Sequence, residues 1–192
     1  MSIDLGAGDA GSAEHLRETP TARRMIHTGR LLTIYDDDVR LADGTPAQRQ
    51  VVVHPGAVAI VAIDDADRVV LVRQWRHAVG APLWELPAGT RDPGEPPLQT
   101  AERELAEETG LRAGDLHPLA VAPLTPGYST EVMHFFVATG LTQGATDRDV
   151  DERMDVAHQS REEVARLIRA GEVDVKTIAG LALAGWSTGI HG

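Results

Sequence analysis

Glu104, Glu107 and Glu108 are the residues of this sequence with the most evident chemistry. Proline suits the first turn of a helix and glycine suits the left-handed residue that ends one. The segment PPLQTAERELAEETG therefore predicts a helix over about residues 97–109. At roughly 100° per residue, the three carboxylates share one face of this helix. The sequence thus predicts a short helix with an acidic face.

An acidic helix face is usually solvated surface, but that interpretation fits this one poorly. Like charges three or four residues apart destabilise a helix, and Arg103 is the only cation on the helix within reach of Glu107. A divalent cation would relieve the remaining repulsion. Cysteine is absent and the eight histidines lack the spacing of metal ligands, so the ligands must be oxygen. Oxygen ligands favour Mg²⁺ or Mn²⁺.

The stretch from Gly89 to Leu111 resembles the Nudix box at every fixed position. The family pattern is glycine, five residues, glutamate, seven residues, then Arg-Glu-aliphatic-any-Glu-Glu-any-Gly-aliphatic, and this sequence reads GTRDPGEPPLQTAERELAEETGL. A chance match somewhere in the chain is on the order of 1 in 10⁷ at average residue frequencies. The resemblance implies a metal-dependent pyrophosphohydrolase.

The resemblance also implies a role for each charged position of the box. Glu104 and Glu108 are the expected principal metal ligands, with the carbonyl oxygen of Ala88 as a further one. Glu107 is expected to be an additional ligand or a support, and Arg103 to orient the glutamates. Two or three Mg²⁺ (or Mn²⁺) ions held in this way would neutralise a diphosphate and lower the pKa of a bound water.

Three flanking motifs resemble one branch of the family, the ADP-ribose pyrophosphatases and related nucleoside-diphosphate-sugar hydrolases. They are RQWR at residues 73–76, WELPAG at 84–89 and PGYSTE at 126–131. The expected reaction is hydrolysis of ADP-ribose, or a related nucleoside diphosphate sugar, to AMP and ribose 5-phosphate. Other substrates stay open, namely GDP-mannose, a dinucleoside polyphosphate or an oxidised nucleoside triphosphate, because the box recognises only the shared diphosphate. A non-catalytic nucleotide-binding regulator is the alternative of another class, although an intact box favours the enzyme.

In this branch the general base is expected on a loop after the box. Here that loop is the acidic stretch DRDVDERMD at residues 147–155, and Glu152 is preferred over Asp151. The competing interpretation is that the stretch is a solvated acidic loop. Glu95 lies in the loop that precedes the helix, and it would hold this loop against the helix.

Four residues are candidates for substrate binding by resemblance to the branch. Successive residues of a strand face opposite ways, so Arg73 and Arg76 need not both face the substrate. The resemblance places Arg76 near the substrate, so Arg76 is preferred as the guanidinium that binds phosphate. Trp75 is a candidate for stacking on adenine, although a tryptophan in a strand is more often core or interface. Glu85 would contact the base or a partner subunit, and Glu131 would bind substrate or support the proline loop.

The elements that must position these residues form a mixed α/β fold. The resemblance implies an α/β/α sandwich with a mixed sheet over residues 56–192. A small antiparallel β-sheet is expected at 23–55, with a turn at Asp43-Gly44 between runs RLLTIY, DVRLA and QRQVVVH, and a mobile tail at 1–22. The runs AVAIVAI and VVLVRQW read as a core hairpin, a capping box at Ser160 opens a helix, and a last helix is expected over about 176–186.

Composition excludes several classes of function. A formal net charge of −11 argues against a general binder of nucleic acid or membrane surfaces, which needs basic patches. Neither a signal peptide nor an apolar run of membrane-spanning length is present, so a cytoplasmic location is expected. In the resembled branch the N-terminal sheet exchanges between subunits, which implies a homodimer.

Overall fold

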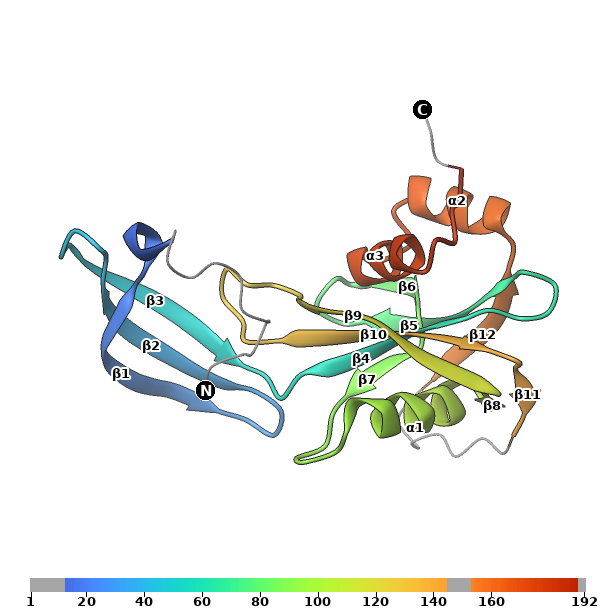
Figure 1. Cartoon of the computed structure of the whole chain (residues 1–192), viewed down its shortest axis with the longest axis horizontal. Coiled ribbons are helices and arrows are strands. Elements are labelled where there is room, and N and C mark those ends of the chain that lie inside the picture. Colours follow the sequence, from blue (N-terminus) through green and yellow to red (C-terminus); the bar gives the residue numbers. More distant parts are fainter. Residues whose placement is uncertain (1–12, 145–152, 190–192) are drawn as a thin grey trace. The chain divides into compact units, whose positions relative to one another are not determined.

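The computed structural model describes residues 13–144 and 153–189 (Figure 1). The chain divides into two compact units. The first comprises Met1–Gly56 and Val121–Val132, and the second comprises Ala57–Ala120 and Met133–Gly192. None of the helices in the described residues is long and apolar enough to cross a membrane.

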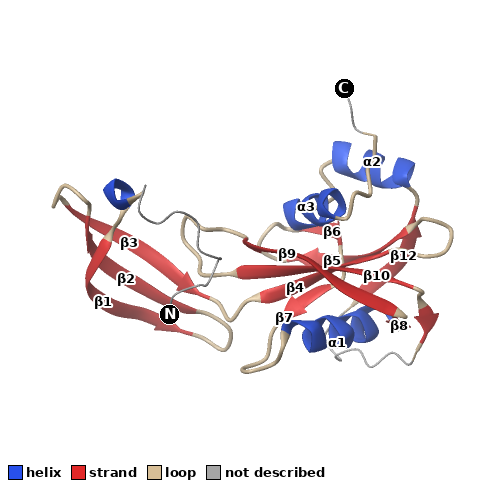
Figure 2. Ribbon diagram, in the orientation of Figure 1, coloured by secondary structure: helices blue, strands red, loops and turns tan. Residues whose placement is uncertain are grey.

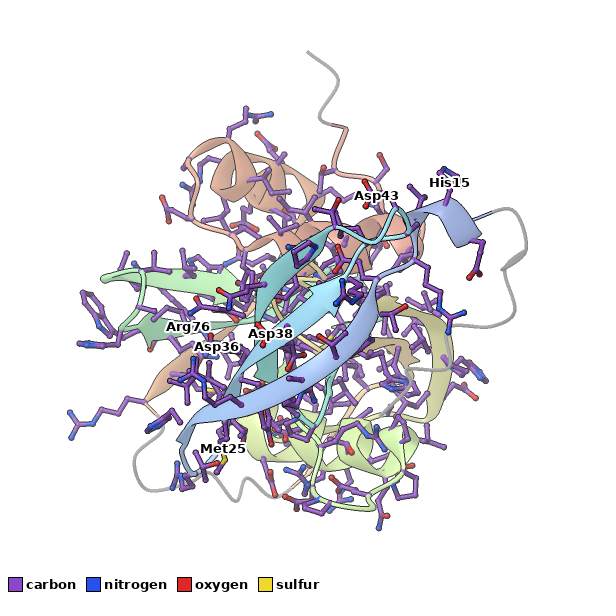
Figure 3. All side chains as sticks on the ribbon, turned by 90° about the vertical axis from the view of Figure 1, so that its left-hand side faces the viewer. His15, Met25, Asp36, Asp38, Asp43 and Arg76 are labelled. Atoms are coloured by element: carbon purple, nitrogen blue, oxygen red, sulfur yellow. The ribbon has the colours of Figure 1, made fainter. Side chains whose placement is uncertain are left out.

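The first unit is built on a three-stranded antiparallel sheet with the order β1-β2-β3. A short 3₁₀ helix, η1 (Glu14–Leu16), precedes the strands β1 (Thr19–Thr28), β2 (Thr33–Arg40) and β3 (Pro46–Val53). Figure 3 labels Met25 and Asp43 at opposite ends of this sheet. Two details differ from the sequence interpretation. The runs RLLTIY and DVRLA contribute to the single strand β2, because their intervening aspartates continue its pairing with both neighbours. Strand β1 starts at Thr19, four residues inside the segment expected to be a tail.

Most of a mixed four-stranded sheet, with the order β7-β4-β10-β9, belongs to the second unit. Strand β4 pairs with β10 in parallel and with β7 antiparallel. Every residue of β4 is buried, as a continuous apolar run predicts for a strand covered on both faces. The strands of this four-stranded sheet are β4 (Ala57–Ala62), β7 (Ala88–Thr90), β9 (Asp115–Pro123) and β10 (Val132–Thr139).

A second, antiparallel sheet has the order β12-β5-β6, and its strands are β5 (Val69–Arg76), β6 (Ala81–Glu85) and β12 (Met154–Gln159). The expected core hairpin of AVAIVAI with VVLVRQW therefore forms only at its turn, and the prediction that the two strands pair along their length is wrong. Strands β4 and β5 join different sheets and meet only at the single bridge between Ile63 and Val69. Both runs are apolar enough to be central strands, so each takes two partners of its own. The short strands β8 (Leu111–Arg112) and β11 (Thr142–Gln143) pair with each other.

Helices cover both faces of the strands in this unit (Figures 1 and 2). Helix α1 (Pro97–Thr109) packs on β4 and β7, and Ala101 and Leu105 meet Val58 and Ile60 in the core. Helix α3 (Val175–Leu183) packs on the other face of β4, where Gly180 lies against Val61. Helix α2 (Arg161–Arg169) lies on the α3 side. The result is the expected α/β/α arrangement with a mixed sheet.

Local signals in the sequence are confirmed at the helix ends. Helix α1 has the predicted bounds, and Gly110 ends it with φ of 73°. Ser160 accepts a hydrogen bond from the backbone of Glu163, whose side chain accepts one from Ser160 N, so the predicted capping box opens α2. The last helix ends at Leu183, three residues before the predicted end.

Candidate active site

The acidic face of α1 lies against strand β7, the strand that leads into the helix loop. Gly89 of β7 pairs with Val58 of β4, directly beneath α1. A Cβ built on Gly89 would lie 1.9 Å from the carboxyl carbon of Glu104. No side chain fits at that distance, so glycine is required for the Glu104 carboxylate to lie against the backbone. The strand and the helix thus form a close-fitting cradle around one carboxylate.

A second carboxylate of the same helix is bound to the same strand. The Ala88 N–H donates to Glu108 Oε2 at 3.0 Å, and Glu108 is only 4% exposed. A buried carboxylate needs such donors, since removing a charge from water is costly. The sequence interpretation considered the Ala88 carbonyl. The structure adds that the amide of the same residue holds a glutamate of the site.

Arg103 connects three glutamates of the box. Its Nη1 donates to Glu104 Oε1 at 2.8 Å and to Glu107 Oε2 at 2.9 Å. Its Nε donates to Glu95 Oε1 and its Nη2 to Glu95 Oε2, both at 3.1 Å. These hydrogen bonds and the neighbouring carboxylates raise the pKa of Arg103, so the guanidinium stays charged. One planar cation with five donors holds this set in a way that a lysine ammonium could not.

Glu95 closes the loop between β7 and α1. It accepts hydrogen bonds from Thr100 Oγ1 at 2.8 Å and from Asp92 N at 3.2 Å, in addition to those from Arg103. Led by the Arg103 hydrogen bonds, these contacts outweigh partial burial and lower the pKa of Glu95 from its ordinary 4.5 to about 2. Glu95 is thus a permanent anion that anchors the loop on the helix.

The depressed pKa of Glu95 predicts an acid-dependent loss of stability. Because the folded-state pKa lies below the ordinary value, the contribution is complete above about pH 4.5 and disappears as the pH falls through about 2. We expect the free energy of unfolding of the wild type to fall more steeply over this interval than that of Glu95→Gln. Urea unfolding at a series of pH values checks this. Parallel curves for the two proteins would contradict it.

The donor set suits a hard divalent cation, although the side chains do not yet converge on one point. Within residues 13–144 and 153–189, no three His, Cys, Asp or Glu side chains form a ready-made metal cluster. Arg103 instead holds Glu104 and Glu107, and Ala88 holds Glu108. All-oxygen carboxylate ligands, pre-positioned on one helix face against a cradle that admits only glycine, are those that Mg²⁺ or Mn²⁺ prefers. The residues present therefore fit such an ion.

The two arginines of the RQWR run point in different directions. Arg76 donates to Glu85 through Nε at 2.6 Å and through Nη2 at 2.5 Å. Arg73 instead lies over the ring of Trp84, 5.8 Å from its centroid. Alternation along β5 explains the difference, since positions three residues apart in a strand face opposite ways. Of the two, Arg76 is the one paired with Glu85, at the end of β5.

Arg76 lies within electrostatic range of the acidic helix. Its pKa is raised first by the hydrogen bonds to Glu85, against the effect of burial, and the charge of Glu108 contributes to the same shift. Glu85 is almost fully buried, which would raise its pKa, but the Arg76 hydrogen bonds and the charge of Lys176 lower it on balance. Both groups are therefore ionised beside the site.

Trp75 lies on an open hollow of about 630 Å³ rather than in the core, and the residue is 61% exposed. The hollow is lined by Arg73, Gln74, Trp75, Pro82, Arg153, Met154 and Asp155. An exposed indole beside guanidinium groups is available to stack on a planar ligand or to meet a partner subunit.

The structure does not join the remaining candidates to these residues by any described contact. Glu131 belongs to the first unit, where its carboxylate is 4.0 Å from His54 Nδ1. Glu152 and Asp151, the candidates for the general base, lie outside the described residues. The structure thus brings together Ala88, Arg103, Glu104, Glu107 and Glu108, with Arg76 and Glu85 nearby.

The sequence interpretation missed the first turn of α3. Lys176 forms ion pairs with Glu85 and Asp174, and Thr177 Oγ1 accepts a hydrogen bond from Leu86 N at 2.8 Å. These residues stood in a segment interpreted only as an apolar helix. One signal was available: Lys176 is the only lysine among the 18 basic residues of the chain.

The chain is similar to known proteins over most of its length. A family model described as the NUDIX domain matches residues 53–179. The ADP-ribose pyrophosphatase of Bacillus subtilis is 36% identical over 165 residues, which cover 84% of this chain and 89% of that protein. The ADP-ribose pyrophosphatase of Mycobacterium tuberculosis is 41% identical over 173 residues, covering 88% and 83%. A crystal structure described as an ADP compounds hydrolase superimposes with a TM-score of 0.75 at 26% identity, covering 89% of this chain and 94% of that one.

Proposed function

The chain belongs to the NUDIX family, and we propose that it hydrolyses the diphosphate bond of ADP-ribose, or of a related nucleoside diphosphate sugar, to AMP and ribose 5-phosphate. The observation that carries the proposal is the cradle of Gly89 and Ala88 against Glu104 and Glu108. It supports the proposal because it holds two glutamates of the box in defined positions against strand β7.

The residues of the chain would hold the metal ions, orient the glutamates and accept the proton of the attacking water. Glu104, Glu107 and Glu108 would hold two or three Mg²⁺ or Mn²⁺ ions, which would supply charge neutralisation and an acidified water. Arg103 orients Glu104 and Glu107 through its hydrogen bonds to their carboxylates. Glu152 is proposed to take the proton from the attacking water, and it lies outside the described residues.

The residues beside the box are proposed to bind the substrate. Arg76 is suited to a diphosphate oxygen, because a guanidinium matches such anions and this one lies within range of Glu108. Glu85 orients Arg76 through two hydrogen bonds. Trp75 is proposed to stack on the adenine, and Glu131 to bind the substrate or support the loop around Pro126.

The test is a panel of substrates incubated with Mg²⁺, Mn²⁺ or EDTA, with products separated by chromatography. The panel contains ADP-ribose, GDP-mannose, ADP-glucose, diadenosine polyphosphates and oxidised dGTP. We expect ADP-ribose to be cleaved fastest and only with metal. A faster rate on another substrate would refute the choice of substrate, and the absence of cleavage with any metal would favour a non-catalytic binding protein.

A homodimer in the cytoplasm is part of the proposal. All ten residues of β1 are exposed, and Met25 and Ile26 are 59% and 46% exposed. A strand with such residues gains cover from a second copy of the chain. Light scattering after size exclusion is expected to give twice the 20.6 kDa chain mass. A monomer mass at micromolar concentration would contradict this.

A further inference from the structure

Lys176 is a buried cation held between two carboxylates. Its ammonium binds Glu85 and Asp174, and its side chain is 9% exposed. Buried lysine is uncommon because its charge is costly to desolvate, and it is tolerated when it is paired on more than one side. The proposed chemistry gives this group no task of its own, so its position needs an explanation.

The position of Lys176 is fixed by the local structure of α3. Asp174 Oδ1 caps the helix by accepting from Thr177 N at 3.0 Å, and the other carboxylate oxygen binds Lys176. Thr177 in turn accepts from Leu86 N, the residue after Glu85. The first turn of α3 is therefore held against the end of β6 by a hydrogen bond from the Leu86 backbone to the Thr177 side chain. This contact places the Lys176 ammonium beside the Glu85 carboxylate.

Glu85 consequently binds two cations, and both contact its Oε2. Arg76 is the exposed partner, with its side chain 40% exposed, and Lys176 is the buried one. The four groups Arg76, Glu85, Lys176 and Asp174 sum to zero net charge. Without Lys176 the same cluster would carry one net negative charge beside a site that must receive a diphosphate, and Arg76 alone would have to neutralise a buried carboxylate.

We propose that Lys176 is a positioning residue for substrate binding, which holds and neutralises Glu85 from the buried side so that Arg76 keeps its orientation and its attraction for the substrate diphosphate. The inference rests on the proposed function, since it takes the ligand to be a nucleoside diphosphate sugar. Lys176 itself does not contact the substrate.

The test compares Lys176→Met with the wild type in two assays. One measures kcat and KM for ADP-ribose with Mg²⁺. The other measures, by calorimetry with Mg²⁺, the affinity for the α,β-methylene analogue of ADP-ribose, in which carbon replaces the bridging oxygen and hydrolysis is blocked. We expect KM to rise roughly tenfold and the affinity to fall by the same factor, with kcat within about twofold, as for a weakened charge-assisted hydrogen bond.

Three further variants separate charge from folding. Lys176→Arg keeps the charge and is expected to retain KM within about threefold. Arg169→Met removes one positive charge from an exposed position of α2 and is expected to leave KM unchanged. If Lys176→Met does not fold, Lys176→Gln removes the charge while keeping a donor for Glu85, and the same rise in KM is expected.

The outcomes distinguish this inference from the proposed function. If the wild type binds the analogue and cleaves ADP-ribose but Lys176→Met changes neither KM nor affinity, the role of Lys176 is refuted alone. A fall in kcat that matches a loss of folded protein would also refute it, as a purely structural role. If the wild type neither binds nor cleaves, the proposed function fails and the inference falls with it. Binding without cleavage refutes the reaction and still tests Lys176 through the affinities.

Discussion

A Glu108→Gln variant is expected to lose nearly all hydrolytic activity while remaining folded. The amide of glutamine still offers an oxygen to the Ala88 N–H, which donates to Glu108 Oε2 at 3.0 Å, so the local backbone has no reason to move. The negative charge that attracts a divalent cation is lost. Metal ions supply several kcal/mol of transition-state stabilisation, so we expect kcat/KM to fall about a thousandfold.

The matched control for this change is Glu102→Gln on the same helix. Glu102 lies on the exposed side of α1, so removing its charge alters the net charge equally without touching the site. Rates with Mg²⁺ and binding of Mn²⁺, followed by electron paramagnetic resonance, are measured for both variants. Equal activity of Glu108→Gln and Glu102→Gln would refute the assignment of the metal site.

Gly89→Ala is the second change with a large expected effect. The new Cβ would lie 1.9 Å from the Glu104 carboxyl carbon and 2.0 Å from its Oε1, closer than any real contact allows. Either the carboxylate rotates away or β7 shifts from β4, and both displace Glu104, which we propose as a metal ligand. A misplacement of about 1 Å at a reacting centre costs on the order of a hundredfold in rate, so we expect that loss in kcat/KM together with weaker Mn²⁺ binding.

An exposed glycine in a turn provides the control for Gly89→Ala. A Cβ at Gly29 would approach nothing more closely than the movable ring of His27, at 3.3 Å. Gly29→Ala is therefore expected to retain activity. Melting temperatures of both variants show whether a lost rate reflects unfolding. Full activity of Gly89→Ala would mean that Glu104 has no fixed position in catalysis.

Much of the site could be predicted because its information is local. The spacing of Glu104, Glu107 and Glu108 on one helix face depends only on the geometry of an α-helix, and a proline and Gly110 mark its ends. The reach of Arg103 to Glu107 is likewise a one-turn contact within the helix. For the same reason the capping box at Ser160 was recognisable from four consecutive residues.

The pairing of the strands could not be predicted in the same way from the sequence. The runs that form β4 and β5 are adjacent in sequence and both begin with apolar residues, which suggests a hairpin, yet they enter different sheets. Each pairs instead with segments farther along the chain, β4 with β7 and β10, and β5 with β6 and β12. Periodicity reports which faces of a strand are buried and says nothing about which partner buries them.

By itself, then, the sequence determined the acidic helix, its ends and the family. Only the tertiary structure decided that Gly89 must be glycine because Glu104 lies against it, that Arg76 and not Arg73 pairs with Glu85, and that Lys176 reaches Glu85 from 91 residues away. The physical reason is common to all three. Each depends on where two separately formed elements meet, and side-chain contacts across such a junction are set by packing and sheet register, which short-range spacing does not encode.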